Sequence, residues 1–171
     1  MPGPKRYKTA KIGVILSSEE LLEKLSGGLA IFDKLYVKYE LAGLPPHNSR
    51  QELENYAANA KKRGLEAVIV SAGSNDELPR FTAEKCLAPL IFAPVSRTNR
   101  SVPQKFLASS SFCVTAANDF SKAAHFALKI LAIRDKSLSR RLLNLSLAKN
   151  ERFAAEDSED FPLAPDDAYG F

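Results

Sequence analysis

The chain has 171 residues, of which 45% are hydrophobic and 26% charged, and its formal net charge is +4. This length and balance indicate one globular domain with a sizeable core. No apolar run is long enough to span a bilayer, which excludes a membrane protein. Residues 1–10 are basic but lack the apolar stretch of a secretory signal, so we predict a cytoplasmic location.

The basic residues do not form the stripe that nucleic-acid binding requires. Arg97, Arg100 and Lys105 are scattered and lack interleaved aromatic side chains. We therefore predict no nucleic-acid partner. The two cysteines, Cys86 and Cys113, have no metal-ligand spacing and are predicted to be small buried hydrophobic residues.

Short apolar runs alternate with helical patterns along the chain. The runs, typical of buried parallel strands, are residues 11–16, 36–41, 67–70, 90–93 and 112–115. Helical patterns follow them, and a last helix is predicted from Lys136 to about Phe153. Repeated strand–helix order indicates βαβ units with right-handed crossovers. The prediction is an α/β fold: a flavodoxin-like three-layer αβα sandwich with a doubly wound parallel sheet.

Several residues mark helix ends. Ser18 is predicted to cap the first helix with its hydroxyl. Ser49 and Glu52 have the spacing of a capping box for a helix to about Arg63, with Gly64 as its stop. Asn118 or Asp119 can cap the helix that runs to about Ile133. The predicted organisation is a basic arm (1–10), an α/β domain (11–153) and an acidic tail (154–171).

Three segments, residues 16–20, 45–49 and 71–79, follow the first three strands, where open α/β sheets bind ligands. In order and spacing they resemble the PurE family, the aminoimidazole ribonucleotide carboxylases and carboxyaminoimidazole ribonucleotide mutases. The matching residues up to the fourth strand are Gly13, Ser18, His47, Tyr56-Ala57, Arg63-Gly64-Leu65, Ala72-Gly73, Leu78-Pro79 and Pro94-Val95. The resemblance resumes at Asn118 and continues through Ile130-Leu131-Ala132.

The resemblance implies a step of de novo purine biosynthesis, carboxyl transfer on an aminoimidazole ribonucleotide, by a carboxylase (a lyase) or a mutase (an isomerase). It implies a homo-oligomer, an octamer in the family, with no cofactor, no metal and no membrane or nucleic-acid partner. His47 corresponds to the family's catalytic histidine, which handles the proton of the imidazole ring. The implied substrate-binding residues are Ser17, Ser18, Glu20, Asn48, Ser71, Ala72, Gly73 and Ser74.

The departures from the family pattern lie in these same segments. Ser17 stands for a glycine, Glu20-Leu21 for Ser-Asp and Pro45-Pro46 for Ser-Ala. Asn48 stands for an arginine and Glu77 for a second histidine. A carboxylate about 4 Å from a phosphate costs about 4 kcal/mol at an effective dielectric of 20, roughly a thousandfold in affinity.

Two hypotheses remain from the sequence. In the first, the chain is a diverged PurE-type carboxylase or mutase that uses His47. In the second, it is a non-catalytic PurE-like binding or assembly protein with a different small ligand or a protein partner. The retained histidine favours the first hypothesis, and the altered segments around it favour the second.

Overall fold

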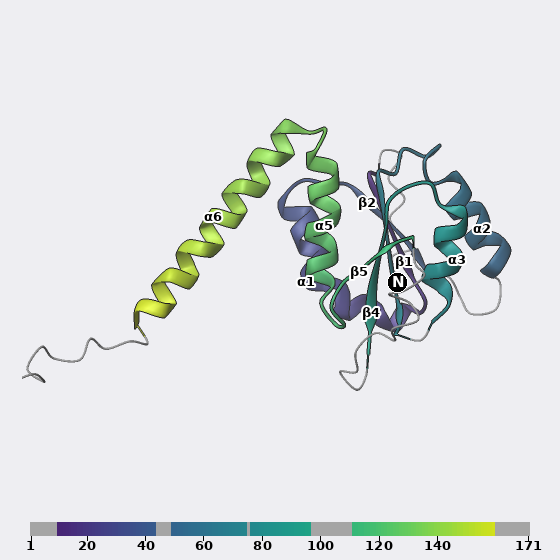
Figure 1. The fold of residues 1–171 in the computed structure, drawn as a ribbon, viewed down its shortest axis with the longest axis horizontal. Helices are drawn as coiled ribbons and strands as arrows, with labels where there is room; N and C mark the ends of the chain where they lie inside the picture. Colours follow the sequence, from purple (N-terminus) through teal and green to yellow (C-terminus); the bar gives the residue numbers. More distant parts are fainter. Residues whose placement is uncertain (1–9, 44–48, 75, 97–110, 160–171) are drawn as a thin grey trace, which may run out of the picture.

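A computed structural model of the chain describes residues 10–43, 49–74, 76–96 and 111–159 (Figure 1). The predicted site residues His47 and Asn48 lie outside these ranges. No helix of the described ranges combines the length and the apolar character needed to cross a membrane.

Five parallel strands form one sheet in the order β2-β1-β3-β4-β5. They are β1 (Ile12–Leu16), β2 (Tyr39–Gly43), β3 (Ala67–Gly73), β4 (Leu90–Val95) and β5 (Cys113–Val114). The order reverses between β1 and β3, as in doubly wound folds. The predicted flavodoxin-like fold class is confirmed.

The helices are η1 (Glu19–Leu21), α1 (Leu22–Lys34), α2 (Ser49–Asn59), α3 (Leu78–Lys85), α5 (Phe120–Ala132) and α6 (Lys136–Glu159). Helices α1 and α5 cover one face of the sheet, and α2 and α3 cover the other (Figure 1). Helix α6 packs on α5 through its first turns, where Leu138 and Leu142 are buried, and then extends away from the sheet (Figure 1).

Some predicted ends differ from the structure. The hydroxyl cap at Ser18 is wrong: η1 intervenes, and α1 begins after Leu21 with no side-chain cap. Helix α2 ends at Asn59, and turns continue to Gly64, whose φ of +85° suits glycine. The last helix continues beyond Phe153 to Glu159.

The second strand begins three residues later than predicted. Tyr36 has a positive φ of 55°, and the Val37 N–H donates to the carbonyl of Phe32, 2.9 Å away. This turn closes the end of α1, so the chain becomes extended only at Tyr39. The first three residues of the apolar run 36–41 therefore belong to the turn after α1 and not to the strand.

Alternation along the strands divides the core into two faces. Val14 and Ile69 pack toward α1 and α5, where Phe32 is fully buried. Ile15 and Val70 point the other way, toward α2 and α3. The α1/α5 face is therefore a continuous apolar layer that joins the sheet to both helices.

The opposite face contains a partly buried polar cluster of Glu40, Tyr56 and Arg63, in which Glu40 is the buried member. The Tyr56 hydroxyl donates to Glu40 Oε1 at 2.8 Å, and Arg63 Nη2 donates to Oε2 at 2.6 Å. The Arg63 guanidinium also lies 4.9 Å from the centroid of the Tyr56 ring. Burial and the neighbouring Glu40 carboxylate raise the pKa of the Tyr56 phenol well above its ordinary value.

Gly13 on β1 makes room for this cluster. It lies opposite Glu40 in the sheet, and a Cβ at this position would clash with the Tyr56 hydroxyl. Any side chain here would therefore displace Tyr56 from its hydrogen bond to Glu40.

Both cysteines are free thiols. Cys86 is half-buried, and this burial raises the pKa of its thiol. Cys113 is exposed, so the prediction that both are buried is wrong. Cys113 lies in the two-residue edge strand β5, which leaves it open to solvent.

Candidate functional site

The ends of β2, β1 and β3 meet at one edge of the sheet. Leu16, the last residue of β1, is in register with Gly43 on β2 and with Ser71 on β3. The chain segments that leave these strands therefore start side by side. This carboxyl edge is where the sheet order reverses and where a ligand of such a fold binds.

The sequence-predicted residues Ser17 and Ser71 are directly connected at this edge. The Ser17 N–H donates to the Ser71 carbonyl at 3.0 Å. This bond fixes the start of the segment after β1 but takes up an N–H that an anion could have used. The half-buried side chain of Ser17 still offers a hydroxyl.

Ser18 is also half-buried, and its carbonyl accepts from the Leu21 N–H at 3.3 Å within η1. Glu20 is exposed on the same short helix. The edge at β1 therefore presents two hydroxyls and one solvated carboxylate, a setting that holds a neutral polar group better than a phosphate dianion.

At the end of β3 the predicted residues divide between the two faces of the sheet. Ser71 is buried at 1% exposure and shares the side of Ala67 and Ile69, which face α1 and α5. Ala72 is buried on the opposite side. The sequence predicted one binding segment, whereas the structure directs its members to different surfaces.

The two residues that follow are open to solvent. Gly73 is exposed, and no atom of the described residues lies within 4 Å of the position that its Cβ would occupy. Ser74 is half-buried. A ligand group can therefore approach the backbone at Gly73 without a steric barrier.

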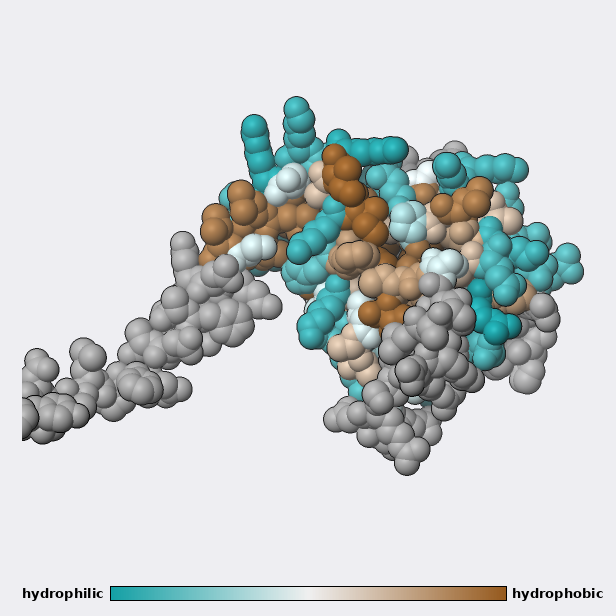
Figure 2. All heavy atoms as spheres, viewed as in Figure 1, coloured by the Kyte–Doolittle hydropathy of each residue, from teal (hydrophilic) through white to brown (hydrophobic). Residues whose placement is uncertain are grey.

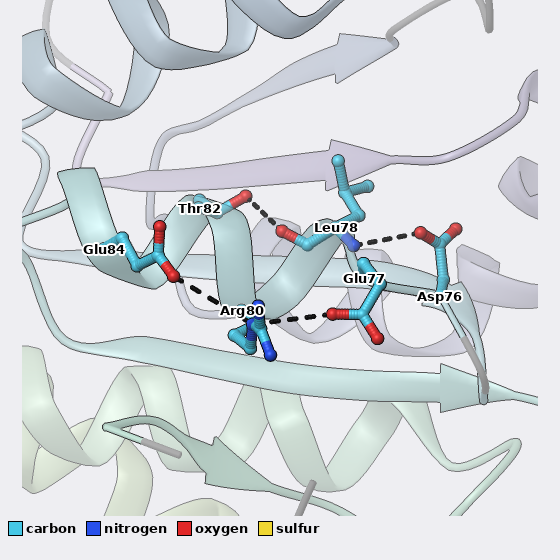
Figure 3. A network of polar contacts seen from close by, with 6 residues as sticks. All are labelled: Asp76, Glu77, Leu78, Arg80, Thr82 and Glu84. Carbon is cyan, nitrogen blue, oxygen red and sulfur yellow. Dashed lines mark hydrogen bonds and ion pairs between the residues drawn. The ribbon is translucent and has the colours of Figure 1, made fainter. Parts of the chain in front are cut away.

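Carboxylates already occupy the start of α3 (Figure 3). Asp76 Oδ1 accepts from the Leu78 N–H at 2.9 Å, and Glu77 pairs with Arg80 at 3.5 Å. Arg80 also lies 3.9 Å from Glu84 on the next turn, so its charge is shared within the helix. The helix start is satisfied by the chain's own carboxylates and does not offer a site for a substrate carboxylate.

A cavity of about 330 Å³ opens beside this edge, on the α1/α5 side of β3 and β4. Its lining comes from the early part of α1, the ends of β3 and β4 and the start of α5: Lys24, Leu25, Ser71, Ala93, Pro94, Val95, Ser96, Asn118, Asp119 and Phe120. It unites residues nearly a hundred positions apart in sequence. We refer to it as the α1/α5 pocket.

Asn118 holds one wall of the α1/α5 pocket. Its side-chain amide accepts from the Ser96 N–H and donates to the Ser96 carbonyl, both at 2.9 Å. Asn118 has a φ of 61°, a conformation that asparagine tolerates. The helix cap is therefore Asp119, whose carboxylate accepts from the Lys122 N–H at 3.1 Å.

Sequence reasoning missed Lys24 and Ser96 as lining residues. Neither belongs to a motif, and a lysine in the first turn of an amphipathic helix is typically a solvated surface residue. Asn118 was recognised as a possible cap, and its real partner is 22 residues away.

His125 lies on the other side of α5 from this edge, in a hollow between α1, α5 and α6. Its Nδ1 is 2.8 Å from the Ser121 carbonyl, so it is held by its own helix. Among the described residues, no cluster of three histidine, cysteine or acidic side chains is placed to hold a metal.

The fold and this edge define a flavodoxin-like α/β protein with a candidate ligand site at the carboxyl ends of its central strands. A family model described as AIR carboxylase matches residues 11–152. The match covers most of the chain, and the chain belongs to the AIR carboxylase, or PurE, family.

Relatives and solved structures agree with this assignment. The N5-carboxyaminoimidazole ribonucleotide mutase of Saccharolobus solfataricus is 26% identical over 80% of this chain and 90% of its own length. The Haemophilus influenzae mutase is 33% identical over 52% of this chain and 54% of its own length. Treponema denticola PurE shares the fold with a TM-score of 0.73 at 14% identity, covering 88% of this chain and 98% of its own.

Proposed function

We propose that this chain is a diverged PurE-type protein that binds an aminoimidazole ribonucleotide at the carboxyl edge and transfers a carboxyl group on it slowly, through His47. The observation that carries the proposal is the arrangement of Ser17, Ser18 and Ser71 at the ends of adjacent strands in a chain of this family. Ser17 and Ser18 supply hydroxyls where the family resemblance places the substrate, and the Ser71 carbonyl fixes the backbone of Ser17 beside them. His47 follows the neighbouring strand in the sequence and supplies the acid–base group.

The expected slowness has a physical origin in the same edge. Glu20 and Glu77 are exposed carboxylates beside the proposed binding surface, and Asp76 is bound to the start of α3. They repel a phosphate or a carboxylate and bring water into the site. Binding and the reaction are therefore both weakened.

The test is turnover of the purified chain with aminoimidazole ribonucleotide plus bicarbonate, and with the carboxyaminoimidazole ribonucleotides. His47→Asn is expected to lower turnover at least about a hundredfold, the usual share of general acid–base catalysis. His125→Asn is the matched control, because His125 lies away from the edge, and should leave turnover unchanged. Equal turnover in the His47→Asn variant and the unaltered chain would remove His47 from the mechanism.

A charge replacement sharpens the test. Asn48→Arg restores the cation that the family resemblance places there. One new charge-assisted bond to phosphate should tighten ribonucleotide binding roughly tenfold in calorimetry. No change in affinity would contradict the placement of the phosphate near residue 48.

A second candidate function is a non-catalytic PurE-like protein that binds another small ligand or a protein partner. The use of Asp76 and Glu77 within α3 favours it, because these groups leave no anion site at that helix start. No turnover and no calorimetric binding of either ribonucleotide would reject the enzyme and support this candidate.

We further propose that the chain forms a homo-oligomer, an octamer by family resemblance. Figure 2 shows hydrophobic residues gathered along the first part of α6, and Leu143 and Leu147 there are 59% and 51% exposed. Such side chains on a projecting helix are typical of an interface between subunits. A monomer mass by light scattering would contradict the proposal.

A further inference from the structure

We propose that the α1/α5 pocket is a binding site for a small monocarboxylate with an apolar body. The inference goes beyond ribonucleotide binding at the open carboxyl edge and does not depend on it. It rests on the pocket's walls, on one hydroxyl in its floor and on the balance of charge at its rim.

The walls of the pocket are mostly apolar and rigidly held. Leu25, Ala93 and Phe120 belong to the core layer between the sheet and α1 and α5. The Asn118 side chain fixes the backbone of Ser96 on the opposite wall. A preformed apolar hollow of about 330 Å³ is at the small end of ligand sites, so it suits a compact ligand with an apolar body.

The floor contains a polar group without a partner. Ser71 Oγ is buried and forms no hydrogen bond in the described part of the chain. The alternation of β3 directs this side chain to the α1/α5 side, where the pocket lies. An unmade hydrogen bond of this kind costs about 1–3 kcal/mol, and a ligand oxygen in the pocket would remove that cost.

The charges around the pocket favour a single negative charge on the ligand. Lys24 lines the pocket and is exposed, and it makes no ion pair with another described residue. Asp119 also lines the pocket, but Lys122 Nζ lies 3.0 Å from its carboxylate and compensates its charge. The net positive charge is therefore that of Lys24, which matches a monoanion better than a dianion.

The start of α5 adds to the preference for an anion. Phe120 is the first residue of this 13-residue helix, and the positive end of the helix dipole therefore lies at the pocket. The Asp119 cap uses the Lys122 N–H, whereas the Phe120 and Ser121 N–H groups in the first turn bond to no other described residue. A ligand carboxylate can lie between these N–H groups and the Lys24 ammonium.

The probe is benzoate, with benzamide as its neutral counterpart, titrated into the full-length chain labelled with ¹⁵N. Benzoate should shift the amide signals of Ser71, Ser96 and Phe120 with millimolar affinity, and benzamide should bind about tenfold more weakly. Lys24→Gln should weaken benzoate binding about tenfold. Lys129→Gln, on the exposed last turn of α5, is the matched control and should bind as the unaltered chain does.

Ser71→Ala separates a ligand role from a structural role. The substitution removes an unpartnered hydroxyl, so the melting temperature should stay the same or rise while benzoate affinity falls about fivefold. A purely structural serine would show a lower melting temperature and unchanged benzoate affinity.

Three results would overturn the proposal: benzoate shifts confined to residues outside the pocket, equal binding of benzoate and benzamide, or unchanged affinity in Lys24→Gln. The outcome is separable from that of the ribonucleotide assay, since no ribonucleotide is present. Benzoate binding without ribonucleotide binding would leave this inference standing and reject the proposed function.

Discussion

The two faces of the sheet are built on different principles. The α1/α5 face is an apolar layer in which side chains such as Phe32 and Leu128 are fully buried. The α2/α3 face contains the partly buried cluster of Glu40, Tyr56 and Arg63, with the Glu40 carboxylate as its buried member. The first face gains its stability from packing, whereas the second has to compensate the desolvation of a carboxylate before it gains anything.

The difference bears on function because the α1/α5 face is also where a polar group is left without a partner. Every polar atom of the Glu40 carboxylate is matched by a donor on the opposite face. The Ser71 hydroxyl, which lines the α1/α5 pocket, has no hydrogen-bond partner among the described residues. The contrast shows that this chain can satisfy a buried polar group, which makes the unsatisfied Ser71 hydroxyl informative. In the described part of the chain, Arg141 Nε is a second buried polar atom without a partner, and it lies on α6 away from the sheet.

The largest effect is expected from Phe32→Ala on the α1/α5 face. Phe32 is fully buried and its ring centroid lies 5.4 Å from that of Tyr39, so its loss leaves a cavity. The free energy of unfolding should fall by about 3–5 kcal/mol in urea denaturation. Phe126→Ala, 43% exposed on α5, is the control and should cost less than about 1 kcal/mol. Equal losses of unfolding free energy in the two variants would contradict the claim that packing in the apolar layer stabilises this face.

On the α2/α3 face, Glu40→Ala should cost about 2 kcal/mol, because Tyr56 loses its acceptor and Arg63 loses its buried charge partner. The loss is below that of a fully buried pair, since the Arg63 side chain is 39% exposed and can turn to water. The control Glu84→Ala breaks only a surface pair and should stay within about 0.5 kcal/mol.

A triple replacement decides whether this cluster stabilises the fold. Glu40→Met combined with Tyr56→Phe and Arg63→Leu replaces all polar groups by apolar ones of similar size. We expect the free energy of unfolding to return to within about 1 kcal/mol of the unaltered chain. A loss as large as the Glu40→Ala loss would mean that the cluster is net stabilising.

Adjacent glycines of α1 give an internal comparison on the apolar face. A Cβ at Gly28 would clash with the Phe120 ring, so Gly28→Ala should cost about 1–3 kcal/mol. Among the described residues, a Cβ at Gly27 would meet only Ser121 Oγ, at 3.7 Å, so Gly27→Ala should stabilise by about 0.5–1 kcal/mol through helix propensity. Thermal unfolding of the two variants should give shifts of opposite sign.

The smallest effect concerns pH on the α2/α3 face. The raised pKa of Tyr56 means that the folded chain prefers the neutral phenol. This preference contributes to the free energy of unfolding below the ordinary pKa of 10.0, and the contribution is lost as the pH rises above that value. Tyr56→Phe should lower the free energy of unfolding by about 1 kcal/mol at neutral pH, because the hydrogen bond to Glu40 is lost. Above about pH 10 the variant should lose less of its free energy of unfolding than the unaltered chain does, because it has no phenol to ionise.

Urea denaturation at a series of pH values checks this prediction. Tyr36→Phe is the control, because Tyr36 is 85% exposed and should leave the pH dependence unchanged. Parallel stability curves for Tyr56→Phe and the unaltered chain would remove Tyr56 as the source of the alkaline loss.

Local patterns were sufficient for the framework of the fold. Runs such as residues 67–70 predicted buried parallel strands, and strand–helix alternation predicted the doubly wound sheet. Strand and helix ends were predicted less accurately, because the backbone hydrogen bonds from Leu21 to Ser18 and from Val37 to Phe32 form turns that the residue pattern does not mark. The predicted roles of His47 and of the serines remain predictions for the experiments above.

The sequence by itself determined the fold class, the family and the position of His47 after the second strand, because hydrophobic periodicity and motif order are local properties of the chain. Only the tertiary structure decided that the Ser71 hydroxyl faces α1 and α5 with no partner among the described residues, and that Asp76 is bound to the start of α3. It also brought Lys24 to the same pocket as Ser96 and Asn118. The physical reason is that strand pairing and helix packing place residues distant in sequence in contact, and the pocket exists only where those elements meet.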